Sequence, residues 1–270
     1  MEPTSARRKN GRLARFSLAI AAVALIASPA SAEERATLPL APPPAAFLHV
    51  DGATAPSVGV TVARSAVTIS DAGSGARPFA SDLGRAGIVY ALGAEAGLTP
   101  WLSFVATGLT DGPSADLATA SGMSAGARFA PFAGGATRLS LTVGALRELA
   151  GATGTFARIA FAHDVGRARL AMSAHGEHVT SPGRDGLDVM VSAGATYAIA
   201  GPLRIGVEYV GQDLEGALDP TELEGVRHFV GPTMALDLER HGLSLVAGPA
   251  MGLSPTSPRA VGRMAIAYAF

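Results

Sequence analysis

Apolar residues alternate with small or polar residues along most of the chain after about position 57. A period of two is typical of a β-strand with one apolar and one polar face. The alternating segments are about 9 to 13 residues long, the length of tilted strands that cross a membrane. The strands are expected at 57–70, 85–97, 101–109, 119–131, 137–148, 154–163, 168–177, 187–199, 203–211, 226–238, 242–251 and 259–270. About twelve strands are therefore predicted, or ten if the weak first stretch is not part of the sheet.

The connections between these strands alternate between short and long. Short turns are expected at 98–100, 132–136, 165–167, 200–202 and 239–242. Longer links are expected at 71–84, 110–118, 178–186, 212–225 and 252–258, and the short link at 149–153 is an exception. This alternation predicts an all-β, antiparallel, up-and-down transmembrane barrel at 57–270.

The last strand has the clearest pattern. Its apolar residues recur at every second position up to the final residue, with Arg263 and alanines between them; they are Met264, Ile266, Tyr268 and Phe270. This pattern resembles the C-terminal signature of Gram-negative outer-membrane β-barrel proteins, which acts as an assembly signal. The resemblance implies the barrel assembly machinery as a partner, outer-membrane lipid and lipopolysaccharide around the barrel, and short turns on the periplasmic side.

The first 32 residues have the features of a cleaved signal peptide. Arginines and Lys9 form a basic start, Phe16 to Ala27 is apolar, and Ala30 and Ala32 are the small residues that precede a cleavage site. An uncleaved anchor is the alternative, but spanning a bilayer takes about 20 apolar residues. Residues 33–56 contain the run Pro42-Pro43-Pro44, which favours an extended periplasmic leader.

Composition excludes several classes of function. With no cysteine the chain has no disulfides or thiolate metal sites. The signal peptide carries five basic residues, so its removal makes the chain more acidic than its formal net charge of −1, and no basic patch indicates nucleic acid. No apolar run after Ala32 is long enough for a spanning helix, and a closed barrel is the other way to satisfy backbone groups in lipid.

A soluble sandwich or lipocalin-like barrel would show the same alternation of apolar and polar residues. The terminal phenylalanine and the unequal links favour the membrane barrel.

The polar face of the strands carries charged side chains that we expect inside the barrel. The candidates for a pore lining are Glu95, Arg128, Arg138, Arg158, Arg169, Asp188, Arg204, Glu208, Arg227, Asp237 and Arg263. Such charges can line water and set ion selectivity, or pair across the interior and plug it. Small inward residues such as Gly126, Gly206 and Gly248 slightly favour a modest channel. A passive, porin-like pore for small solutes is therefore predicted, with a plugged structural barrel as the alternative.

Enzymatic chemistry is a third possibility, and the sequence offers one constellation for it. Ser173, His175 and Glu177 share a face near the outer end of one strand, as a lipid hydrolase at the rim would require. Alternate residues of a strand lie about 6.5 to 7 Å apart, too far for a direct serine–histidine hydrogen bond. No nucleotide motif or histidine metal motif occurs, and the acidic loops lack the ligand spacing of a calcium motif. No enzyme activity, metal or cofactor is expected.

Overall fold

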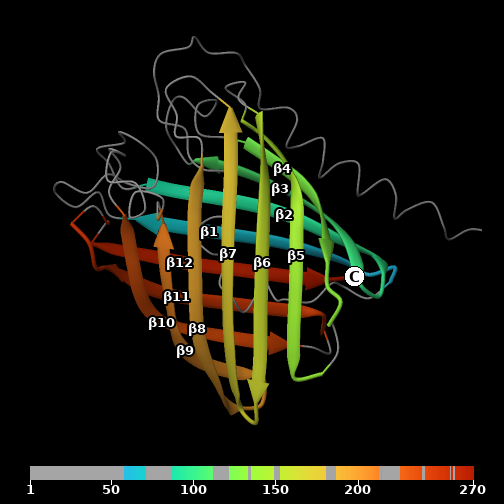
Figure 1. Ribbon diagram of the computed structural model, residues 1–270. Helices are drawn as coiled ribbons and strands as arrows, with labels where there is room; N and C mark the ends of the chain where they lie inside the picture. Colours follow the sequence, from blue (N-terminus) through green and yellow to red (C-terminus); the bar gives the residue numbers. More distant parts are fainter. Residues whose placement is uncertain are drawn as a thin grey trace, which may run out of the picture.

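The computed structural model describes residues 58–70, 87–111, 122–132, 135–148, 153–180, 187–212, 214, 226–238, 241–255, 257 and 259–270. These residues form twelve strands (Figure 1). They are β1 (Thr61–Ser70), β2 (Gly87–Thr99), β3 (Leu102–Asp111), β4 (Gly122–Phe129), β5 (Thr137–Glu148), β6 (Thr153–Val165), β7 (Ala168–Thr180), β8 (Asp188–Ala200), β9 (Leu203–Gln212), β10 (Arg227–Leu238), β11 (Leu243–Gly252) and β12 (Ala260–Ala269). The predicted signal peptide at 1–32 and leader at 33–56 lie outside the described residues.

The sheet closes on itself. Every strand pairs antiparallel with its neighbours in sequence, and β1 pairs with β12 from Val62↔Ala269 to Ser70↔Val261. At the end of this seam the backbone N–H groups of Thr61 and Phe270 each donate to the other residue's carbonyl, at 3.0 and 2.9 Å. The predicted antiparallel barrel is confirmed, and the ten-strand alternative is wrong because β1 is hydrogen-bonded on both sides.

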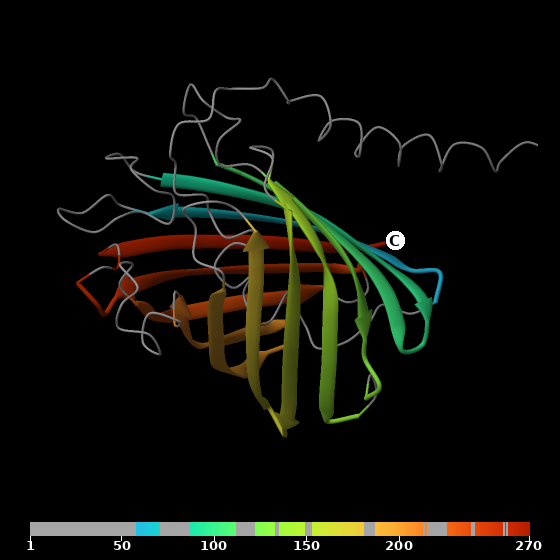
Figure 2. The ribbon, with the colours of Figure 1, turned by 45° about the horizontal axis from the view of Figure 1, so that its top comes forward.

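Strands on opposite walls cross steeply. In Figure 1, β5 to β8 run upright at the front while β10 to β12 run across behind them, and the turned view in Figure 2 keeps this relation. Such crossing follows from closing a sheet, because the strands must tilt against the barrel axis.

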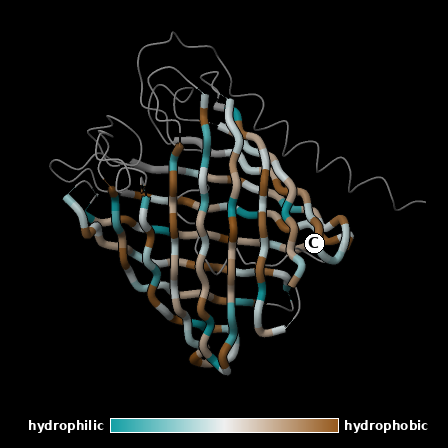
Figure 3. The backbone as a smooth tube through the Cα atoms, viewed as in Figure 1, coloured by the Kyte–Doolittle hydropathy of each residue, from teal (hydrophilic) through white to brown (hydrophobic). Residues whose placement is uncertain are grey.

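The two faces of each strand are as the alternation predicts. In β12, Arg263 and Ala265 are buried while Met264, Ile266 and Tyr268 are exposed. Hydrophobic residues recur at alternate positions along the strands in Figure 3. Because the exposed set is apolar and the buried set includes charges, the outer surface of the barrel suits lipid.

The short connections lie together at one end, here called the short-turn end, and the longer links lie at the other, the long-link end. The β6–β7 turn has only two residues, Gly166 and Arg167, and Gly166 has a φ of 58°, which glycine adopts without strain. This hairpin is longer than predicted, because pairing continues to Thr153↔Thr180. The link at 149–152 is short, as the sequence indicated.

Aromatic side chains mark the outside of the short-turn end. Trp101 meets Phe129 edge to face at 5.5 Å between ring centroids, and Tyr268 stacks on Phe270 at 5.9 Å. Tyr209 lies toward the long-link end, where its hydroxyl is 2.7 Å from His228 Nδ1. Amphipathic rings favour the membrane–water interface, so these residues fit the two borders of an apolar band.

Several inward glycines sit where neighbouring backbones approach closely. A Cβ added to Gly126, Gly206 or Gly248 would lie 2.4, 2.0 or 2.2 Å from a carbonyl oxygen of an adjacent strand. These glycines therefore permit close backbone approach between adjacent strands, and their contribution to a channel stays a prediction.

The interior also contains apolar clusters. One joins Met190, Val210, Phe229, Ala250 and Val261 along the wall from β8 to β12. A second contains Ala91, Leu146 and Val179, with Ala66 and Phe156 packed against it. In the described part of the chain, no helix is both long enough and apolar enough to span a membrane.

Candidate functional site

Charged side chains line the inside of the barrel. Among the strand residues whose side chains are described, eight arginines and six carboxylates face inward. They are Arg64, Arg128, Arg138, Arg158, Arg169, Arg204, Arg227 and Arg263, with Glu95, Asp164, Glu177, Asp188, Glu208 and Asp237. All eleven residues predicted to face the lumen are among them, and their role in a pore stays a prediction.

Glu95 is the centre of a buried ion cluster, the Glu95 cluster. Its side chain is 0% exposed, and its Oε2 lies 2.7 Å from Arg64 Nη1 and 2.9 Å from Arg128 Nη1. Ser103 Oγ donates to Oε1 at 2.5 Å, and Arg128 Nε donates to Thr142 Oγ1 at 3.3 Å. One carboxylate thus connects side chains from β1 to β4, and Arg128 extends the contacts to β5.

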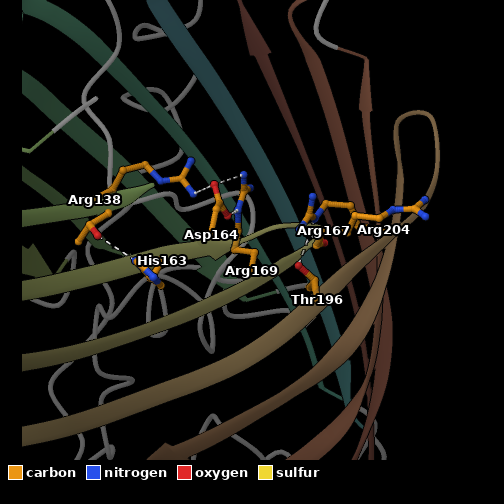
Figure 4. A network of polar contacts seen from close by, with 8 residues as sticks. Arg138, His163, Asp164, Arg167, Arg169, Thr196 and Arg204 are labelled. Atoms are coloured by element: carbon orange, nitrogen blue, oxygen red, sulfur yellow. Dashed lines mark hydrogen bonds and ion pairs between the residues drawn. The ribbon is translucent and has the colours of Figure 1, made fainter. Parts of the chain in front are cut away.

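A second cluster lies at the short-turn end and is only partly buried (Figure 4). Arg138 Nη2 lies 2.5 Å from Asp164 Oδ2, and Arg169 Nε donates to Asp164 Oδ1 at 2.7 Å. Exposed fractions are 17% for Arg138, 23% for Arg169 and 30% for Asp164. Arg204 lies nearby and donates from Nε to Thr196 Oγ1 at 3.2 Å. We call Arg138, Asp164, Arg169 and Arg204 the mouth cluster.

The mouth cluster has an excess of positive charge. Asp164 neutralises one of its three arginines, and Asp237 on β10 attracts the charge of Arg204 while accepting a hydrogen bond from Ser244 at 2.6 Å, so three arginines face two carboxylates at this end. Because these guanidinium groups are partly in contact with water, they produce a positive potential at this end of the barrel.

Deeper charges are buried. Arg158 is 7% exposed, and its Nη2 donates to Ser173 Oγ at 3.3 Å. Arg263 Nη1 lies 3.5 Å from Glu208 Oε2, and both side chains are less than 5% exposed. These deeper charged side chains are therefore shielded from water, whereas those of the mouth cluster are only partly shielded.

The Ser173, His175 and Glu177 face is not at an exposed rim. All three side chains are buried inside the barrel. His175 Nε2 lies 2.8 Å from Glu177 Oε1, while the Ser173 hydroxyl lies 2.8 Å from Ser192 Oγ. The three residues lie toward the long-link end of β7, as predicted, but their side chains are enclosed in the barrel, and the serine hydroxyl pairs with Ser192 and Arg158 instead of His175.

Sequence reasoning missed Arg64 and Asp164. Arg64 lies in the first strand, whose faces were not assigned because its alternation is weak, and Asp164 is the last but one residue of a strand that was predicted to end at 163. Among the described residues, no group of three or more His, Asp or Glu could hold a metal ion.

The solved structures that match this chain include outer-membrane proteins. An outer-membrane channel from Pseudomonas putida F1 matches with a TM-score of 0.54 and 13% identity, over 80% of this chain and 97% of that one. A KdgM porin matches with a TM-score of 0.49 and 8% identity, over 77% and 99%. The translocator domain of the autotransporter NalP from Neisseria meningitidis matches with a TM-score of 0.47 and 13% identity, over 82% and 91%. No family model and no curated protein matches this chain. At such identities the likeness to the Pseudomonas channel shows a shared barrel fold.

Proposed function

We propose that this protein is a porin-like barrel of the outer membrane that passes small anions through a narrow, arginine-rich lumen. The mouth cluster is the observation that carries the proposal, because its three partly exposed arginines outnumber the two carboxylates near them, Asp164 and Asp237. A positive entrance concentrates anions and repels cations.

Two further features support this function. Inward arginines outnumber inward carboxylates among the described side chains, although burying charge is costly and an apolar filling is often at least as stable. The outer surface is apolar and bordered by aromatic side chains, as a lipid bilayer requires. The Pseudomonas putida protein with the same fold is described as an outer-membrane channel, which agrees with the proposal.

A structural barrel with a plugged lumen is the second candidate. The burial of Glu95, Arg158 and Glu177 favours it, because an open pore would expose such side chains to water.

A conductance measurement separates the channel from the plugged barrel. The full chain is expressed in a Gram-negative host, purified from its outer membrane and inserted in a planar bilayer. Discrete steps with an anion-selective reversal potential support the channel. A folded protein without conductance contradicts it.

Neutralising the mouth cluster is expected to reduce anion selectivity. A unit charge about 7 Å from an ion in water contributes about 0.6 kcal/mol, roughly a threefold change in local ion concentration. Because the chloride concentration falls and the potassium concentration rises by this factor, Arg169→Gln should lower the chloride-to-potassium permeability ratio about sevenfold, and Arg138→Gln with Arg169→Gln should lower it further. The reversal potential is measured at low ionic strength, where screening is weak.

Arg147→Gln is the matched control for these variants. Arg147 lies on β5 near the long-link end, and its side chain is exposed on the outer face. Removal of this charge should leave the permeability ratio unchanged. An equal shift in Arg147→Gln and Arg169→Gln would contradict a selective role of the mouth cluster.

A further inference from the structure

The second apolar cluster connects opposite walls of the barrel. Ala91 lies on β2, whereas Leu146 lies on β5 and Val179 on β7. β2 is adjacent only to β1 and β3 in the barrel, so its contact with this cluster crosses the interior. Ala66 of β1 and Phe156 of β6 pack against this cluster. We call the five residues together the apolar bridge: Ala66, Ala91, Leu146, Phe156 and Val179.

The aromatic ring of Phe156 is held on two sides. It stacks on His175 at 5.7 Å between centroids with an interplanar angle of 23°, and His175 is anchored to Glu177. On the other side the ring lies over Gly144 of β5, where an added Cβ would come within 2.6 Å of Phe156 Cε1. The ring therefore occupies space that any larger residue at 144 would take, and its position inside the lumen is fixed by its neighbours.

The apolar bridge and the mouth cluster lie at different positions along the length of the strands. Phe156 is the fourth residue of β6 from the long-link end, and Asp164 is next to the last. Eight residues of strand separate them by about 26 Å. A hydrated ion that enters at the mouth cluster passes charged groups first and then meets a contact made only of carbon.

An apolar constriction opposes ion passage more strongly than its width suggests. Water leaves a narrow carbon-lined segment, and the five side chains of the apolar bridge offer an ion no polar group in place of its lost hydration; the adjacent His175 ring is already bonded to Glu177.

We propose that the apolar bridge, with Phe156 and Leu146 as its largest side chains, is the permeability barrier of the lumen and sets the rate of ion passage. This inference rests on the proposed function, since it requires a path through the barrel. It assigns selectivity between anions and cations to the mouth cluster and the size of the conductance to the bridge.

Truncation of the bridge tests the proposal in planar bilayers. Phe156→Ala and Leu146→Ala should each raise single-channel conductance at least about threefold, because a wider constriction holds water. Phe161→Ala and Leu141→Ala are matched controls on the same two strands. Both native side chains face outward, so these variants should conduct as the wild type does. Folding of each variant is checked by its mobility on a gel before and after heating.

The outcomes separate failure of the bridge from failure of the channel. Conducting wild-type protein with unchanged conductance in both bridge variants overturns the barrier and leaves the anion path standing. Folded wild type and folded variants that are all silent overturn both proposals. Conductance that is higher in the bridge variants than in a conducting wild type supports the barrier. A similar increase in the outward controls overturns the assignment to the bridge.

Discussion

Replacing Glu95 by alanine is expected to destabilise the barrel by about 3 to 5 kcal/mol, the usual cost of removing one partner from a buried ion cluster. Glu95 is completely buried and lies within 2.9 Å of two guanidinium groups. Its loss leaves Arg64 and Arg128 close together without the carboxylate between them. Urea unfolding followed by the fluorescence of the single tryptophan, Trp101, measures the effect.

Two comparisons identify the source of this cost. Ser103→Ala removes one hydrogen bond to Glu95 and keeps the charges, so it should cost only about 1 to 3 kcal/mol. The combined variant Arg64→Met, Glu95→Leu and Arg128→Met removes all three charges and should recover much of the lost stability. A triple variant no more stable than Glu95→Ala would contradict an electrostatic origin.

Gly206→Ala is expected to cost about 3 kcal/mol or more, at the upper end of the usual range for overpacking. The added Cβ would lie 2.0 Å from the carbonyl oxygen of Ala195 and 2.8 Å from Thr196 Cα. These are backbone atoms of β8, so a side chain cannot rotate away to relieve the contact. The strands must separate, which weakens a ladder that has no water to replace lost hydrogen bonds.

Gly176→Ala is the matched control on a nearby strand. The nearest atom to its added Cβ is Asp188 O at 4.0 Å, an ordinary contact. Its stability should stay within about 0.5 kcal/mol of the wild type. If both alanine variants unfold at the same urea concentration as the wild type, close backbone approach at Gly206 is not a constraint on the fold.

Much of the fold could be predicted because lipid and lumen impose opposite chemistry on alternate residues. In β12 this rule places Arg263 inside and Ile266 outside without any knowledge of the partner strands. The unequal connections then fix the order of the strands, because antiparallel neighbours need only short turns.

The contacts inside the barrel could not be predicted in the same way. Alternation shows which face a residue occupies but not which residue lies opposite, so the contact of Glu95 with Arg64 depends on a register that only the paired strands define. The apolar bridge was missed for a second reason: inward Phe156 and Leu146 break the rule that the inner face is polar. Their contact with Ala91 depends on the curvature of the wall between β2 and β5.

The seam between β1 and β12 has a consequence for folding kinetics. Every other pair of strands is a hairpin of local contacts, whereas Val62 and Ala269 meet across about 200 residues. Closing a loop of that length costs about 2 kcal/mol more than closing one of 20 residues. High contact order makes such a step slow, so eleven hairpins are expected to form before the seam. Until then β1 and β12 each present an open edge, and the rate of maturation depends on how quickly Phe270 reaches Thr61.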